Sequence, residues 1–87
     1  MLGQLRGQHV HIWQVEQEYH ILVVSNDPLI GAVLDELTQL EANCQSDRHS
    51  HQIPELMHSE EGYLFIARGA HAFIFVRLFL AMEKEAN

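Results

Sequence analysis

The pattern of apolar and polar residues predicts two pairs of strands on either side of one amphipathic helix. His9 to Val15 and Tyr19 to Val24 are rich in Val, Ile, Tyr and Trp, which favour extended structure, and the polar Glu16-Gln17-Glu18 separates them. We interpret these two segments as a β-hairpin.

A helix is predicted to begin at Pro28, with Asp27 as its N-cap. Proline suits the first helical position because its missing N–H costs nothing there, and an aspartate carboxylate can accept bonds from the first free N–H groups. Apolar residues follow at helical spacing, at Ile30, Val33, Leu34, Leu37 and Leu40. We expect this stripe to be buried, and Gly31 within the helix indicates a close approach to a neighbouring backbone.

The second half of the chain is predicted to hold a polar connection and a second hairpin. Gln45 to Ser59 is expected to be a long exposed connection, with one short turn of helix at Pro54–Met57. Residues 63–68 and 71–81 are interpreted as strands, and Gly69 suits the turn between them. The competing interpretation is a helix from 70 to 86, because periodicity cannot distinguish the two in a nearly all-apolar run. The Phe, Ile and Val content favours the strand.

These elements predict a single α+β domain spanning residues 1–87. It would be a two-layer sandwich, with a four-stranded antiparallel sheet in ββαββ order, one main helix on one face, and room for a short C-terminal helix. The other face would be lined by Trp13, Phe73, Phe75, Arg77 and Phe79. Such a patch is too apolar for most soluble monomers, so we expect a homodimer or another protein partner there. The alternative is that the C-terminal tail folds back over this face.

Charge and cysteine content narrow the classes of partner and compartment. The chain of 87 residues carries a formal net charge of −7, which opposes binding to nucleic acid and to anionic membranes. The only cysteine, Cys44, cannot form an internal disulfide, and the first residues lack the apolar stretch of a signal peptide, so we expect a cytoplasmic protein. The longest apolar run, 72–82, is too short to span a bilayer.

Histidines supply the main candidate chemistry. His9 and His11 share one strand face, as two ligands of one metal ion would. A turn of two or four residues would pair Trp13 with His20 and bring His20 onto the same face, whereas a three-residue turn would move it to the other face. His9, His11 and His20 therefore form a candidate site for zinc or nickel.

Two further patterns involve histidine. His49 and His51, with Asp47 and Cys44 nearby, are a second candidate ligand set in the polar connection. The spacing of Gly3, His9, His11 and Glu16 is similar to the first half of the cupin metal motif, Gly-x5-His-x-His-x4-Glu. The motif's closing glycine falls on Val23 and its second half is absent, so this resemblance ends at Glu16.

The function that these features favour is a small acidic binding or regulatory module that dimerises or docks a protein through an aromatic sheet face. The alternative is a metal-binding or metal-responsive protein that uses His9, His11 and His20. A third hypothesis is a small enzyme with a histidine general base, but no nucleophile, base and orienting group can be assigned together.

Overall fold

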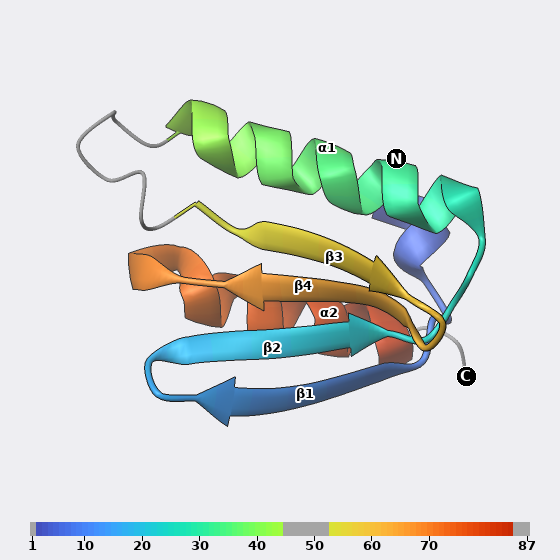
Figure 1. Ribbon diagram of the computed structural model, residues 1–87, viewed down its shortest axis with the longest axis horizontal. Helices are drawn as coiled ribbons and strands as arrows, with labels where there is room; N and C mark the ends of the chain where they lie inside the picture. Colours follow the sequence, from blue (N-terminus) through green and yellow to red (C-terminus); the bar gives the residue numbers. More distant parts are fainter. Residues whose placement is uncertain (1, 45–52, 85–87) are drawn as a thin grey trace.

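The protein consists of two ββα units that share one sheet (Figure 1). The computed structural model describes residues 2–44 and 53–84. In chain order the elements are η1 (Leu2–Leu5), β1 (Val10–Val15), β2 (Glu18–Val23), α1 (Pro28–Cys44), β3 (Glu55–Ser59), β4 (Gly62–Ala67), η3 (Gly69–His71) and α2 (Ala72–Lys84). The strands are antiparallel in the order β1-β2-β4-β3, which confirms the predicted α+β fold with a four-stranded antiparallel sheet.

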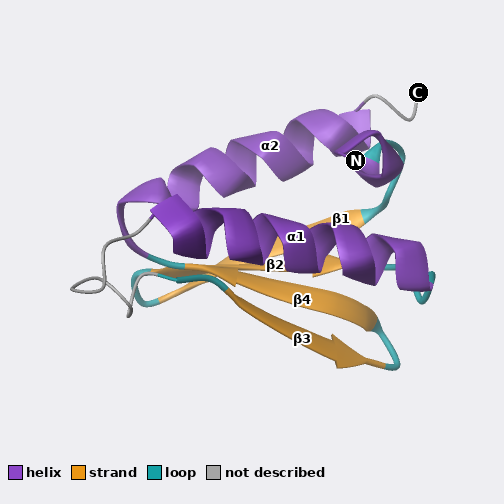
Figure 2. Ribbon diagram, turned by 90° about the horizontal axis from the view of Figure 1, so that it is seen from above, coloured by secondary structure: helices purple, strands orange, loops and turns teal. Residues whose placement is uncertain are grey.

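Both helices lie on the same face of the sheet (Figure 2). α1 packs against β3, and α2 packs against β1, β2 and β4, so each unit's helix lies beside the hairpin of the other unit. The core between the layers includes the rings of Phe65 and Phe79, whose centroids are 5.6 Å apart, together with Ile21 and Leu34. None of the helices in the described part of the chain combines the length and apolarity needed to cross a bilayer.

The first hairpin has the two-residue turn that places His20 beside Trp13. Val15 pairs with Glu18 and Trp13 pairs with His20, which confirms the register expected for an even turn. Glu16 in the turn has a φ of 56°, a left-handed conformation that costs an L-residue about 1–2 kcal/mol.

α1 begins as the sequence predicts. The backbone N–H of Leu29 donates to Oδ1 of Asp27 at 2.9 Å, so Asp27 is the N-cap. Of the predicted buried stripe, Leu40 is exposed, and the neighbouring Glu41 is buried instead, where its carboxylate contacts Nδ1 of His71. The stripe is otherwise buried, at Ile30, Val33, Leu34 and Leu37.

The close approach at Gly31 involves a side chain instead of a backbone. A Cβ at this position would lie 2.6 Å from Cε1 of Tyr63, whose hydroxyl donates to the carbonyl of Asp27 at 3.2 Å. Gly31 therefore lets the start of α1 pack directly on the ring of a β4 residue.

The connection predicted over 45–59 is wrong in its second part. Residues 55–59 form β3, an edge strand paired with β4, and Pro54–Met57 is not a turn of helix. The hairpin turn is Glu60-Glu61, not the Gly69 region. Residues 45–52, which include His49 and His51, lie outside the described residues.

The strand predicted over 71–81 is also wrong, because His71 ends η3 and the following residues belong to α2. Ala72, Phe75, Val76 and Phe79 are buried, a spacing of three and four that fits a helix with one side on the sheet. The competing helical interpretation of this segment is the correct one. The fourth strand of the predicted sheet is supplied by β3 instead.

Candidate functional site: the open face of the sheet

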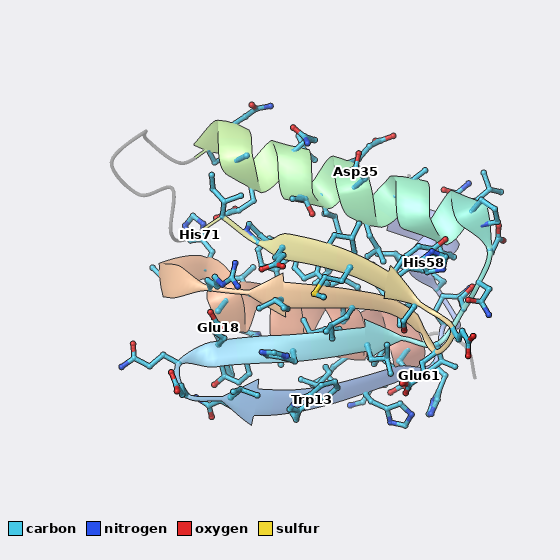
Figure 3. The ribbon with its side chains drawn as sticks, in the orientation of Figure 1. Trp13, Glu18, Asp35, His58, Glu61 and His71 are labelled. Carbon is cyan, nitrogen blue, oxygen red and sulfur yellow. The ribbon has the colours of Figure 1, made fainter. Side chains whose placement is uncertain are left out.

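The sheet face opposite both helices, here called the open face, is formed by alternate residues of all four strands. The strand registers set two complete rows across this face: Trp13, His20, Ile66 and Glu55, and then His11, Leu22, Leu64 and Met57. Figure 3 looks onto the open face, with Trp13 on β1, Glu18 at one end of β2, and Glu61 in the turn at the opposite end of the sheet.

The middle of the open face is apolar. Trp13 is 43% exposed and Met57 is 50% exposed, at the two edges of the sheet. Between and beside them lie four more apolar side chains, Val15, Leu22, Leu64 and Ile66. An antiparallel sheet with one solvated face normally presents polar residues there. Exposed apolar side chains such as Trp13 and Met57 in that position are typical of an interaction surface.

A charged network closes one end of the open face. Arg68 follows β4, and its Nε donates to Oε2 of Glu18 at 2.6 Å while its second guanidinium nitrogen donates to Oε1 of Glu55 at 2.8 Å. The hydrogen bond from Arg68 holds the pKa of Glu18 below its ordinary value, against a smaller opposing effect of desolvation. Both carboxylates in turn raise the pKa of Arg68, so the network carries one net negative charge.

We expect the Arg68→Gln variant to raise the pKa of Glu18 toward its ordinary value, because it removes the main donor and the positive charge. A carboxyl with a depressed folded-state pKa favours the folded state above its unfolded-state pKa, and this contribution is lost as the pH falls through the folded value. In the wild type, the ion pair between Glu18 and Arg68 should therefore be lost only at pH values below the ordinary pKa of glutamate. Carbon-13 NMR titration of the Glu18 carboxyl measures the shift, and Arg77→Gln, on the exposed side of α2, should leave it unchanged.

His20 connects the network to the apolar centre. Its ring lies 5.5 Å from that of Trp13, and its Nε2 is 3.5 Å from Oε1 of Glu18. A distance of 3.5 Å is long for a hydrogen bond, and the buried Nε2 has no hydrogen-bond partner among the described residues. His20 thus covers the side of Trp13 and offers a polar atom beneath any molecule bound there.

The three histidines predicted as metal ligands are only partly brought together. His11 and His20 lie on the open face in adjacent rows, and the rings of His9 and His11 are 4.7 Å apart. Nδ1 of His9, however, lies 3.0 Å from Oε2 of Glu83 on α2. Among residues 2–44 and 53–84, no three His, Cys, Asp or Glu side chains are grouped closely enough to hold a metal ion.

The five residues predicted to line one sheet face separate in the structure. Only Trp13 lies on the open face, whereas the other four belong to α2. Phe75 and Phe79 are buried in the core, while Phe73 and Arg77 are on the exposed side of the helix. The prediction that these five residues line one sheet face is therefore wrong for the four that belong to α2.

A surface pocket of about 450 Å³ lies at the end of the open face opposite Arg68. Leu22 and Val24 form its apolar part, and His11, Glu60 and Glu61 add polar groups. The two glutamates belong to the β3–β4 turn, and the carbonyl of Glu60 accepts a bond from Nδ2 of Asn26 at 3.5 Å. This end of the open face is suited to a positively charged side chain.

Sequence reasoning missed the central residues of the open face. Leu22, Leu64 and Ile66 belong to strands that were predicted, and alternation along these strands would have placed them opposite the helix-facing Ile21 and Phe65. Met57 could not be found because β3 was not recognised as a strand. Comparison of the chain with protein-family models, with curated proteins and with solved structures finds no match.

Proposed function

We propose that this protein is a small binding module that docks a segment of a partner protein on the open face of its sheet. The observation that carries the proposal is the apolar centre of that face, which neither helix covers. Trp13 and Met57 supply the exposed apolar area, and Leu22 and Leu64 form the floor between them. Aromatic residues and methionine are enriched in the centres of protein interfaces.

The charges around the open face favour a partner segment with basic flanks. The network of Glu18, Glu55 and Arg68 has a net charge of −1 at one end, and Glu60 and Glu61 line the pocket at the other. The whole chain carries −7, so an acidic peptide would be disfavoured at the open face. An apolar segment with Lys or Arg on either side would match both the centre and the ends.

A cytoplasmic setting is part of this proposal, since the single Cys44 is free and exposed. Metal binding is left out of the proposal because, among the described residues, the predicted ligands are not grouped closely enough to hold a metal ion. The proposed role is recognition of a partner segment. Burial of apolar side chains would supply the affinity, and the acidic groups at the two ends of the open face would supply the selectivity.

Selection from a library of displayed random peptides of about twelve residues tests the proposal directly. We expect enrichment of sequences with two or three apolar residues flanked by Lys or Arg. On addition of a selected peptide, amide NMR shifts should move in Leu22, Leu64 and Ile66. Shifts confined to the exposed side of α2, or a library with no enrichment, would contradict the proposal.

A matched pair of variants separates the open face from general surface apolarity. Met57→Glu places a charge in the apolar centre and should weaken binding of the selected peptide at least about tenfold. Leu29→Glu changes an equally exposed residue on α1 and should leave binding unchanged. Increasing salt should also weaken binding, because the attraction between basic flanks and acidic ends is screened. Equal losses in both variants would rule out the open face as the site.

A further inference from the structure

The two edges of the sheet are protected to different degrees. β3 is preceded by Pro54, begins with Glu55 and is followed by the Glu60-Glu61 turn, and proline and charge on an edge strand discourage pairing with another strand. β1 has the sequence VHIWQV, with no proline and no Asp, Glu, Lys or Arg. Every residue in it except Gln14 and His11 strongly favours extended structure or is aromatic. β1 is therefore the edge at which another strand can add.

The hydrogen-bond pattern identifies which peptide groups of β1 are available. The N–H of Val24 donates to the carbonyl of His9 at 2.9 Å, so alternate β1 residues counted from His9 are directed toward β2. The peptide groups of Val10, Ile12 and Gln14 are then directed away from the sheet. The N–H of Val10 already donates to Oε2 of Glu83 at 2.9 Å. Within residues 2–44 and 53–84, Ile12 and Gln14 have no such partner.

An exposed apolar stripe of α2 runs beside this edge. The ring of Phe73 lies 6.3 Å from that of Tyr19 on β2, near the start of α2, and Glu83 reaches Val10 near the end of α2. Phe73 and Leu80 lie on one side of the helix, seven residues apart, and are 57% and 44% exposed, with the exposed Arg77 between them. The open edge of β1 and this stripe thus form one continuous surface in two layers.

We propose that two copies of this chain pair through β1, antiparallel about an axis that passes at Trp13. Ile12 of each copy would then exchange N–H···O=C bonds with Gln14 of the other, which uses the two available residues and leaves the Glu83 contact of Val10 intact. If the axis passed at Ile12, the peptide group of Val10 would have to pair with the other copy, and its N–H already donates to Glu83. The arrangement is isologous, since each copy offers the same residues to the other.

The helices fit this arrangement. α2 packs against β1, β2 and β4 and is centred over β2, so with strands about 4.8 Å apart the two copies of α2 would run antiparallel at roughly 14 Å. Close helix packing occurs at about 8–10 Å, and large side chains bridge the difference. Phe73 of one copy would face Leu80 of the other, because these residues lie on either side of the level of Trp13 along the helix. Both exposed residues of the stripe would be covered.

The area involved predicts a dimer that dissociates on dilution. A strip of one strand edge and one helix flank, about 20 Å long and two layers deep, buries roughly 1,000–1,200 Å² in total, at the lower limit for a specific interface. We therefore expect a dissociation constant in the micromolar range. Added salt should strengthen the dimer, because two copies of an acidic chain repel each other at low ionic strength. This is opposite to the salt dependence of peptide binding on the open face.

Sedimentation velocity over about 1–200 µM protein tests the dimer. Gln14→Pro removes an N–H that is directed away from β2, so the fold should survive while each dimer loses two hydrogen bonds and weakens about 10- to 100-fold. His58→Pro makes the corresponding change on the β3 edge and should not affect association. If Gln14→Pro does not fold, Phe73→Glu on the exposed helix side provides the same test. A wild type that stays monomeric throughout, or a dimer unaffected by these variants, would overturn the proposal.

Cross-linking tests the register. In a Cys44→Ser background, Trp13→Cys places two thiols across the axis in a non-hydrogen-bonded pair, about 4.5 Å apart at Cα and within disulfide range. Mild oxidation should give a covalent dimer. His11→Cys leaves the equivalent thiols roughly four residues apart along the strands and should not cross-link. Cross-linking of His11→Cys with none of Trp13→Cys would contradict the register. Loss of peptide binding in Met57→Glu with the dimer intact would show that the two surfaces act separately.

Discussion

Replacing Phe79 with alanine is expected to lower the free energy of unfolding by about 3–5 kcal/mol. Phe79 is 1% exposed and its ring packs on Phe65 of β4, so truncation removes apolar contact and leaves a cavity between α2 and the sheet. Circular dichroism during thermal and urea unfolding measures the loss.

Phe73→Ala is the matched control for Phe79→Ala. Phe73 belongs to the same helix but is 57% exposed, so its loss should cost less than about 0.5 kcal/mol in the dilute monomer. In the strand that the sequence predicted, Phe73, Phe75 and Phe79 would lie on one side and be equivalent. Equal destabilisation by both substitutions would therefore contradict the helical structure of this segment.

Gly62→Ala is expected to destabilise the protein by about 2–4 kcal/mol, the second large effect. Gly62 begins β4 with a φ of 140°, and a Cβ there would lie 2.1 Å from the carbonyl oxygen of Val23. The contact is with backbone, so relief requires a shift of β2 against β4, with overpacking and conformational strain combined.

Gly3→Ala provides the comparison for Gly62→Ala. A Cβ at Gly3, in η1, would meet no atom within 4 Å, so its substitution should leave the unfolding midpoint nearly unchanged. Thermal unfolding of the two variants at equal concentration makes the comparison. A Gly62→Ala protein as stable as Gly3→Ala would be incompatible with the close approach of β4 to the end of β2.

The first half of the fold could be predicted from sequence because local signals agree there. Asp27 and Pro28 mark the start of α1 by capping chemistry, and the apolar spacing that follows has the period of a helix. In the hairpin, the pairing of Trp13 with His20 that an even turn predicts is the register of the structure.

The second half could not be predicted because local signals there are weak or misleading. AFIFVRLFL is apolar in every position but one, so neither period is visible, and Phe, Ile and Val favoured the strand. β3, with the sequence ELMHS, has no β-branched residue, and its strand structure depends on pairing with β4.

Of the five residues predicted to line an interface, only Trp13 belongs to the open face. The expected excess of apolar strand residues included 71–81, most of which form α2. The residues of the open face are exposed because α2 lies on the same side of the sheet as α1. Local sequence patterns do not specify this long-range arrangement. Arg68 joined to Glu18 and Glu55 likewise required the strand order.

Each ββα unit has its helix beside the hairpin of the other unit, and this arrangement affects how the chain folds. During synthesis the β1–β2 hairpin is made first, but the face that it turns toward the helices stays uncovered until α2, the last helix of the described chain, has been made. A fragment ending at Cys44 would have its helix beside the place of a missing β3 and would not form a stable core. Folding should therefore be a single all-or-none event dominated by contacts between distant parts of the sequence, and slow for so short a protein.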